Sequence, residues 1–385
     1  MTRPRYYADH RTANTIISLS RLTLTRLTMK NRHSRIMHIA SGKGFDAVAA
    51  FQPENVFYLT NFWGEAIAIC NSDRTTLIVP KLEASRAQQD TKDCELIFSD
   101  RGLPVIDTFI KLVKGKVVCA DYVDYSTVKA IQTKSSEKHF IVNADTLLEG
   151  RMIKDESEIY AIRKAAKVLD DLYEICTREV KIGRSERALQ AKIIFEAMQM
   201  GANAACHKST LNPLIIASGP NGALPHAQVS DRKFEDGDMV VIDLTLRYGS
   251  YIADATRTFA LGRTSSETKE AYELVKQSQQ VGIDCAEEGV VCERVDKECR
   301  ALITDAGYGG QFIHSTGHGI GLDVHEPPWL RTPNQQVLER NMAITIEPGI
   351  YLQGKFGIRI EDSIIVDNGR AKNLNDFTKD LLVLA

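Results

Sequence analysis

Hydrophobic and polar positions follow two different periods along the chain. Up to about residue 145, short apolar runs rich in β-branched residues are separated by Pro, Asn, Gly and Asp, a pattern typical of strands joined by turns. The expected strands are 45–51, 56–60, 65–70, 75–79, 116–120 and 140–143. Helical spacing at 81–89 and 104–113 lies between them, so the pattern predicts a small α/β domain with a mixed sheet.

The second part of the chain begins with long helical patterns instead. Asp155 followed three residues later by Glu158 is typical of a capping box, and Ser185 can cap a second helix. The same order returns at 267–288 and 293–306. A strand hairpin follows each pair of helices, so the pattern predicts an α+β domain with an internal pseudo-twofold repeat.

The first of these hairpins, at 240–258, carries two acids. If Tyr248 and Gly249 form a two-residue turn, Asp243 pairs directly with Asp254 on one face. Opposed residues lie about 4.5–5.5 Å apart at Cβ, where like charges are destabilising unless a cation lies between them. A divalent cation is the favoured interpretation, because the apolar flanks argue against two exposed acids on a solvated hairpin.

The second hairpin repeats this arrangement, and histidines gather near it. Glu347 and Glu361 lie on either side of a turn at Gly354 that suits three or five residues, and alternation places Arg359 on the face of Glu361. Four of the five histidines after position 200 are hard to attribute to core packing. These four are His226, His314, His318 and His325.

Composition narrows the class of protein without identifying it. A chain of 385 residues is long enough for two domains, and a net charge of −2 gives no support for a nucleic-acid partner. No apolar run approaches the roughly 18 residues that cross a bilayer, and the start lacks the apolar core of a secretory signal. We expect a cytoplasmic protein without a membrane partner, whose eight scattered cysteines are reduced.

The first 36 residues differ from the rest in charge. They hold eight Lys or Arg against one acid, which is +7 in a chain that totals −2. This composition resembles a transit peptide, but a disordered basic arm or a start placed too far upstream explains it as well, and we favour the last. The expected organisation is an extension over 1–28, an α/β domain over 29–150 and a second domain over 151–385.

Five acids and histidines in five separate motifs make the chain similar to the pita-bread metallopeptidases, the superfamily of methionine aminopeptidases, aminopeptidase P and prolidase. The residues that match the metal ligands of that superfamily are Asp243, Asp254, His318, Glu347 and Glu361. The runs 347–351 and 357–362 and the α/β first domain resemble the Xaa-Pro peptidase branch. One departure is Thr245, where the family usually has Gly, and its side chain is expected to crowd the site or hydrogen-bond to it.

The resemblance implies a pita-bread catalytic domain over 151–385, preceded by a creatinase-like α/β domain, and a pair of divalent ions. Four carboxylates and two divalent ions are near neutral together, and one His among many oxygens favours Mn²⁺ or Co²⁺ over Zn²⁺ or Fe²⁺. The resemblance assigns Glu347 as the proton shuttle. It assigns His226 and His325 to hydrogen bonds with the substrate and the oxyanion, and His314, Tyr351 and Arg359 to the proline pocket.

The expected function is hydrolysis of the Xaa-Pro bond in dipeptides or in peptides with proline at the second position. A methionine aminopeptidase is one alternative, which Arg359 and the first domain argue against. A non-catalytic pita-bread binding protein is another, although such proteins typically lack the metal ligands. The resemblance also implies a homodimer formed through the first domain, with the turn at 61–64 near its rim. Dipeptidase and aminopeptidase P activity are both compatible with the sequence.

Overall fold

The computed structural model describes residues 28–205, 210, 212 and 214–385. The chain forms two compact units, which divide between Arg151 and Met152. The extension expected over 1–28 lies outside the described residues except for residue 28, and residues 28–42 are helical. Among the helices in the described part of the chain, none is long and apolar enough to cross a membrane.

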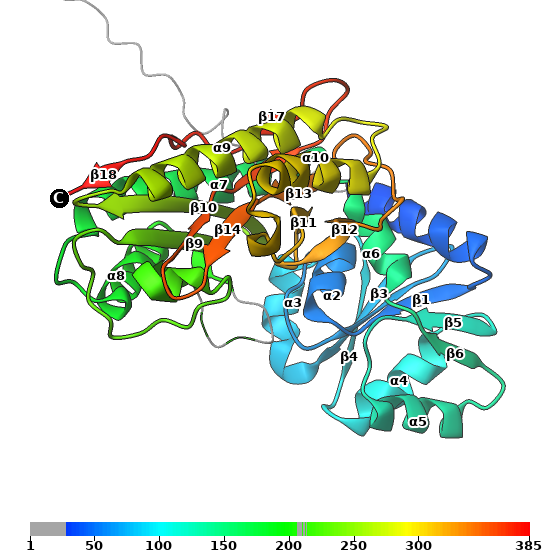
Figure 1. Ribbon diagram of the computed structural model, residues 1–385. Helices are drawn as coiled ribbons and strands as arrows, with labels where there is room; N and C mark the ends of the chain where they lie inside the picture. The colour runs from blue at the N-terminus through cyan, green and yellow to red at the C-terminus, as the bar shows by residue number, and fades with distance from the viewer. Residues whose placement is uncertain (1–27, 206–209, 211, 213) are drawn as a thin grey trace, which may run out of the picture. The chain divides into compact units, whose positions relative to one another are not determined.

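A six-stranded mixed sheet forms the centre of the first unit (Figure 1). Its strands, in sheet order, are β4 (Glu95–Ser99), β3 (Thr75–Pro80), β2 (Ile67–Cys70), β1 (Ala47–Ala50), β5 (Val117–Ala120) and β6 (His139–Val142). The pairs β1/β2 and β2/β3 are antiparallel, and the other three pairs are parallel. Its helical segments are α2 (Pro53–Thr60), η1 (Lys81–Glu83), α3 (Ala84–Asp90), α4 (Leu103–Leu112), α5 (Tyr125–Lys134) and α6 (Asp145–Met152). The predicted mixed α/β domain is confirmed.

The run at 56–60 is helical, so the strand predicted there is wrong. It forms the second half of α2, which has Pro53 in its first turn and ends at Asn61 with a φ of 63°. Every residue from Asn55 to Thr60 is buried. A helix buried on all sides has no polar face to reveal its period. Pro53 was the available signal for a helix, because proline is favourable at a helix start.

Two pairs of helices organise the second unit. The first pair is α7 (Glu156–Glu179) with α8 (Glu186–Gln199), and the second is α9 (Ser266–Cys285) with α10 (Cys292–Asp305). The predicted capping box is present, since Asp155 accepts hydrogen bonds from Ser157 and Glu158 backbone N–H groups and Glu158 accepts one from the Asp155 N–H. Ser185 caps α8 as predicted. A hairpin follows each pair, which matches the predicted repeat.

Three sheets complete this unit, and α7 runs along the long strands of the first (Figure 1). The first sheet contains β18 (Val383–Leu384), β10 (Tyr251–Leu261), β9 (Met239–Tyr248) and β7 (Asn203–Ala204), with β8 (Ile215–Ser218) also paired to β9. The second contains β12 (Glu326–Leu330), β11 (Gly317–Gly319), β13 (Ala343–Ile346), β16 (Asp362–Ile365) and β17 (Lys372–Asn373). The third is the hairpin β14 (Gly349–Leu352) and β15 (Phe356–Arg359). Short 3₁₀ turns lie at η2 (Gly219–Ala223) and η3 (Gly309–Gln311).

The turn of the β9/β10 hairpin differs from the predicted one. Tyr248 pairs with Tyr251, so the loop consists of Gly249 and Ser250 and not of Tyr248 and Gly249. Both loop residues have positive φ, 54° and 75°, as a two-residue type I′ turn requires. The sequence Gly-Ser fits this turn better than Tyr-Gly, because a bulky residue at positive φ is strained.

The β14/β15 hairpin has one of the two turn lengths predicted for it. Leu352 pairs with Phe356, which leaves a three-residue loop with Gly354 at a φ of 75°. Alternation along β15 behaves as expected. Ile358 joins the apolar core of this unit, whereas the side chain of Arg359 reaches the acids on the other face.

Candidate active site

A cavity of about 340 Å³ in the second unit brings the candidate residues together. Nine of the ten predicted site residues line it: His226, Asp243, Asp254, His314, His318, His325, Glu347, Arg359 and Glu361. The tenth, Tyr351, is buried behind this lining and contacts His314 and Arg359. The volume lies at the lower end of the range for small-molecule sites, roughly 300–1,000 Å³.

The β9/β10 hairpin supplies two acids in a register that the sequence did not predict. Asp243 faces Thr256 and Asp254 faces Thr245, so the expected direct pairing of the two acids is wrong. The register differs by two positions, and an even shift leaves both acids on the same face of the sheet. Asp243 and Asp254 are therefore diagonal neighbours, and the threonine beside Asp254 donates to its Oδ1 at 2.8 Å. The hydrogen bond expected for Thr245 is confirmed.

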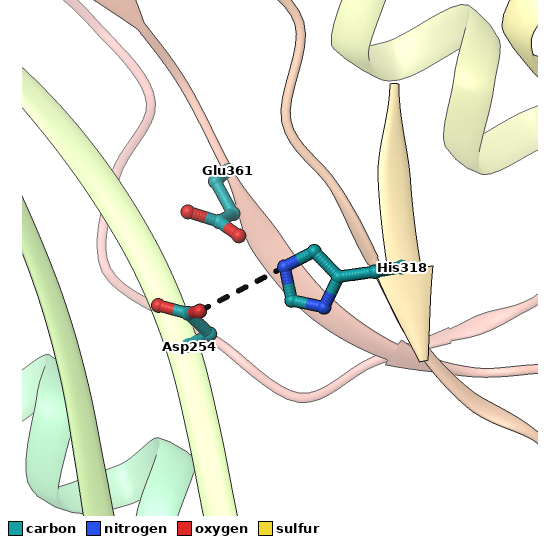
Figure 2. Close-up of side chains that lie close together, drawn as sticks. All are labelled: Asp254, His318 and Glu361. Atoms are coloured by element: carbon teal, nitrogen blue, oxygen red, sulfur yellow. Dashed lines mark ion pairs between the residues drawn. The ribbon is translucent and has the colours of Figure 1, made fainter. Parts of the chain in front are cut away.

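Asp254, His318 and Glu361 form the centre of the acid cluster, and their side chains converge from β10, from β11 and from the link between β15 and β16 (Figure 2). One ligand atom from each lies within 4.8 Å of the other two. The His318 Nδ1–H donates to the Gly319 carbonyl at 3.0 Å. This bond leaves Nε2 unprotonated in the neutral ring and directs it toward the acids.

The glycines on either side of His318 explain how β11 fits between its neighbours. A Cβ at Gly317 would lie 2.0 Å from the Thr345 carbonyl oxygen, and one at Gly319 would lie 2.2 Å from that of Pro327. Any larger residue would force the strands apart. The Gly-His-Gly sequence therefore allows β12 and β13 to hold His318 closely from both sides.

Glu347 lies beside His318, in the turn between β13 and β14. Its Oε1 is 3.3 Å from His318 Nε2, and its backbone N–H donates to the Thr316 carbonyl at 2.8 Å. Burial raises the pKa of Glu347, but the hydrogen bond and charge of His318 in its protonated form, with His314 and Arg359, outweigh it and lower the pKa to about 2. Glu347 is therefore ionised at neutral pH.

The other acids of the cluster indicate that positive charge is needed here. Burial, followed by repulsion from neighbouring acids, raises the pKa of Asp254 and of Glu361 well above the ordinary range. Asp243 Oδ1 and Glu361 Oε1 are buried and have no hydrogen-bond partner among the described residues. Buried carboxylate oxygens are rarely left in this way unless they bind water or an ion. Four carboxylates and one imidazole fit divalent cations that prefer oxygen ligands.

Arg359 connects the acids to the predicted proline pocket. Its guanidinium forms an ion pair with Asp243 and donates to the Tyr351 hydroxyl at 2.6 Å. The Tyr351 hydroxyl lies 2.9 Å from His314 Nε2, and His314 Nδ1–H donates to the Ser315 carbonyl at 2.7 Å. Because burial also lowers the pKa of His314, a neutral ring that accepts a hydrogen bond from Tyr351 accounts for this geometry.

His226 and His325 reach the cavity from two loops. His226 is exposed and follows η2, whereas His325 immediately precedes β12. The His325 ring is perpendicular to the His318 ring, with 4.3 Å between the ring centres. Both histidines lie where a side chain can contact a molecule bound beside the acids.

Sequence reasoning missed two members of the site, Thr256 and Trp329. Thr256 donates to Glu361 Oε2 at 2.7 Å and accepts a hydrogen bond from Arg359 Nε at 3.1 Å. It lies two residues after Asp254, so the alternation of the strand already placed it on the same face. Trp329 on β12 lines the cavity. Its position depends on how β12 pairs with β11, for which the sequence offers no comparable signal.

Comparison with known proteins finds two family matches, one in the first part of the chain and one in the second. Residues 160–368 match the metallopeptidase family M24, and residues 32–153 match the creatinase/prolidase N-terminal domain. The chain is 34% identical over 363 residues to the Xaa-Pro dipeptidase of Pyrococcus furiosus, which covers 92% of this chain and 100% of that protein.

Two solved structures extend this likeness to three dimensions. An Xaa-Pro dipeptidase from Bacillus anthracis superposes with a TM-score of 0.86 at 31% identity, over 92% of this chain and 100% of that one. An X-Pro aminopeptidase from Thermotoga maritima superposes with a TM-score of 0.81 at 32% identity, over 91% and 99%. The resemblance read from the sequence motifs is thereby confirmed, and the chain belongs to the metallopeptidase family M24, with a creatinase/prolidase N-terminal domain ahead of the catalytic one.

Proposed function

We propose that this metallopeptidase hydrolyses the bond between an N-terminal residue and a following proline. The observation that carries the proposal is that one cavity collects the five candidate metal ligands together with Arg359 and His314, and that Tyr351 joins these two. The proposal is supported by the names of relatives that cover 91–92% of this chain, which are Xaa-Pro dipeptidase and X-Pro aminopeptidase. A methionine aminopeptidase and a non-catalytic binding protein are the alternatives that assays must exclude.

Two divalent ions fit the donor set of this cavity. The proposed ligands are Asp243, Asp254, His318, Glu347 and Glu361. Four carboxylate charges balance two divalent ions, and a single imidazole among oxygens favours Mn²⁺ or Co²⁺, with Zn²⁺ and Fe²⁺ as alternatives. Such ions, when bound, supply the Lewis acidity that activates water for attack on an amide carbon.

The side chains around the ligands have separate proposed roles in proton transfer and charge stabilisation. Glu347 lies beside His318 in the lining of the cavity, and the resemblance assigns it as the proton shuttle. Its carboxylate is proposed to accept a proton from the attacking water and to return it to the proline nitrogen as the bond breaks. His226 and His325 line the cavity beside it and are proposed to donate hydrogen bonds to the substrate and to the developing oxyanion.

The proline side of the cavity is proposed to be formed by His314, Tyr351 and Arg359. The pyrrolidine ring has no N–H and presents a compact apolar face, which suits an aromatic wall. Arg359 already donates from Nε to Thr256, from Nη1 to Tyr351 and the Pro225 carbonyl, and from Nη2 to Asp243. These contacts use four of its five N–H groups. They favour a role for Arg359 in holding Asp243 and Tyr351 over a bidentate contact with a substrate carboxylate.

We also infer a homodimer, which is expected from the resemblance. The turn at 61–64 was assigned to its rim, and within the first unit Phe62 is fully buried while the Trp63 ring packs 5.6 Å from that of Phe57. These contacts account for part of the aromatic surface of the turn without a partner. The mass of the active protein in solution tests the inference, and a monomer with full activity would refute it.

Turnover of matched peptides tests the proposed function. The metal-free protein would be reconstituted with Mn²⁺, Co²⁺ or Zn²⁺ and assayed on Ala-Pro, Ala-Pro-Gly, Ala-Ala and Met-Ala-Gly. We expect cleavage of proline peptides only, and the ratio of Ala-Pro to Ala-Pro-Gly turnover separates a dipeptidase from an aminopeptidase. Equal cleavage of Ala-Ala, or a preference for Met-Ala-Gly, would contradict the Xaa-Pro specificity. Failure to bind any of these metals would favour a binding protein.

A further inference from the structure

Helix α10 carries a buried acid paired with an arginine one turn later. Arg300 Nη2 lies 2.9 Å from Asp296 Oδ1, and its Nε lies 3.4 Å from Oδ2. Only 1% of the Asp296 surface is exposed. An exposed pair at this spacing contributes only about 0.3–0.5 kcal/mol to a helix. Burying a carboxylate costs more free energy than such a pair contributes, unless further hydrogen bonds compensate. The stability of the helix alone therefore does not explain why Asp296 is buried there.

The other donors of Arg300 reach the segment that carries His314. Nη1 donates to the Phe312 carbonyl and Nη2 to the His314 carbonyl, each at 2.7 Å. The guanidinium also stacks 4.0 Å from the centre of the Phe312 ring. That ring meets the His314 ring edge-on, with 5.4 Å between their centres. A planar guanidinium can fix two carbonyls and a ring simultaneously, which a lysine ammonium cannot do.

Asp296 binds Thr316 of the same segment and Thr332, which follows β12. Its Oδ1 accepts from the Thr316 hydroxyl at 2.8 Å, and its Oδ2 accepts from the Thr332 hydroxyl at 2.9 Å. The Thr316 carbonyl in turn accepts the N–H of Glu347 at 2.8 Å. One buried carboxylate thus connects α10 to Thr316, two residues after His314, and to Thr332, which follows β12.

We propose that Asp296 and Arg300 are positioning residues of the peptidase, which hold His314 against Tyr351 at the proline side of the cavity. Neither residue belongs to the described lining of the cavity, so each acts through His314 and not by contact with the substrate. The proposal rests on the proposed function, because His314 matters for proline only if proline binds there. Loss of the Arg300 contacts should therefore weaken substrate binding while the metal ligands keep their places.

Helix α10 also provides a matched control. Arg294 and Glu298 form an ion pair at the same spacing, 3.8 Å apart, with side chains that are 63% and 50% exposed. Arg300→Met should raise KM for Ala-Pro about 10-fold, the scale seen when the partner of a site residue is lost, with kcat and bound Mn²⁺ per chain unchanged. Arg294→Met should leave all three values at the wild-type level. Arg300→Lys should recover part of the KM, because it keeps the charge and one hydrogen bond.

A double-mutant cycle separates positioning from a general loss of structure. His314→Ala removes the group that Arg300 positions, so adding Arg300→Met to it should cause no further rise in KM. If the two effects multiply, or if Arg300→Met lowers kcat and bound Mn²⁺ together, the pair is only structural and the inference fails. Thr332→Val, which removes one hydrogen bond of Asp296, gives a second test should Arg300→Met not fold, and an unchanged KM there would overturn the inference. A wild-type protein that cleaves neither Ala-Pro nor Ala-Pro-Gly refutes the proposed function instead.

Discussion

Both units contain buried carboxylates, but the hydrogen bonding of these groups differs between the two units. In the first unit, both oxygens of the fully buried Asp121 have partners. Oδ1 accepts from the Phe51 N–H at 2.8 Å, and Oδ2 accepts from the Gln52 N–H at 3.0 Å and from the Asn55 amide at 2.9 Å. In the second unit, Asp243 and Glu361 each keep one buried oxygen for which the described part of the chain provides no hydrogen bond.

The difference separates Asp121, a structural acid, from the acids proposed as metal ligands. Burial raises the pKa of Asp121 to about 6, and its three hydrogen bonds and the charge of Arg151 oppose any larger shift. At Glu361 burial also comes first, but the neighbouring acids Asp254, Glu347 and Asp243 add to it. Asp121 therefore fixes a loop in the native state, whereas we propose that the acids of the cavity destabilise the fold unless a cation neutralises them. Four predictions test this contrast, in order of expected effect.

Glu361→Gln should have the largest effect on activity. Turnover of Ala-Pro should fall at least about 100-fold, the upper end of what the loss of a ligand's partner costs in other metal sites. In the metal-free protein the same change should raise the unfolding temperature, because a neutral amide removes repulsion from the cluster. Steady-state assays and thermal denaturation measure both. Near wild-type turnover, or a lower unfolding temperature without metal, would contradict the ligand assignment.

Metal binding should stabilise the protein more at neutral than at acid pH. The folded-state pKa values of Asp254 and Glu361 lie above those of the unfolded chain, so the metal-free folded state binds more protons and its free energy of unfolding falls as pH rises above about 4. For His318, burial lowers the pKa, but Glu347 and Asp254 outweigh it and raise it, so protons also compete with metal for Nε2 at acid pH.

The stabilisation that Mn²⁺ gives depends on the affinity of the folded protein for this ion. At a free Mn²⁺ concentration 100 times Kd, the gain in the free energy of unfolding should be about 2.7 kcal/mol near neutral pH and much smaller at about pH 5. Denaturation with and without Mn²⁺ at both pH values measures it. The same gain at both pH values would show that Asp254 and Glu361, the carboxylates with raised pKa values, do not bind the ion.

Asp121→Asn should lower the stability of the protein and leave its activity unchanged. An amide places N–H donors where the Gln52 N–H and the Asn55 amide already donate, so the free energy of unfolding should drop by about 1–3 kcal/mol. Activity per folded molecule should stay at the wild-type value. Urea denaturation and Ala-Pro turnover on the same sample test both statements. A fall in turnover with full metal occupancy would mean that the first unit takes part in catalysis.

Thr256→Val should have the smallest effect of the four. The substitution keeps the shape of the side chain but removes its hydrogen bonds to Glu361 Oε2 and from Arg359 Nε. Affinity for Mn²⁺ should fall about 10-fold, with little change in kcat once metal saturates the protein. Metal titration of activity measures this, and a loss of kcat at saturation would place Thr256 closer to the reaction than proposed.

The sequence predicted the elements well where a strong period accompanied a cap or turn signal. Asp155 and Ser185 located the starts of α7 and α8, and alternation correctly placed Arg359 on the face of the acids. It failed where the pattern was uniform, as in the fully buried second half of α2. It also failed at the β9/β10 turn, because apolar alternation tolerates a two-position shift without moving any side chain to the other face.

For the site, the sequence identified residues but not the contacts between them. The residues that match a family motif, such as His318 and Glu361, were found through that resemblance, and the structure gathers them in one cavity. Thr256 was missed because its role depends on the register of the hairpin. Asp296 and Arg300 were missed for a related reason. On α10 they form an ordinary ion pair one turn apart, and only the tertiary fold brings the carbonyls of Phe312 and His314 to them.

Titration of metal-free protein with Mn²⁺, with bound metal and Ala-Pro turnover followed in the same sample, tests the central claim most directly. The claim is that the buried acids of the second unit form a two-metal peptidase site. We expect no turnover without metal, and turnover that rises to a plateau as the second ion per chain binds. The Glu361→Gln variant should reach neither two bound ions per chain nor the wild-type plateau of turnover. Full turnover in the metal-free protein, or a plateau with no measurable bound metal, would contradict the claim.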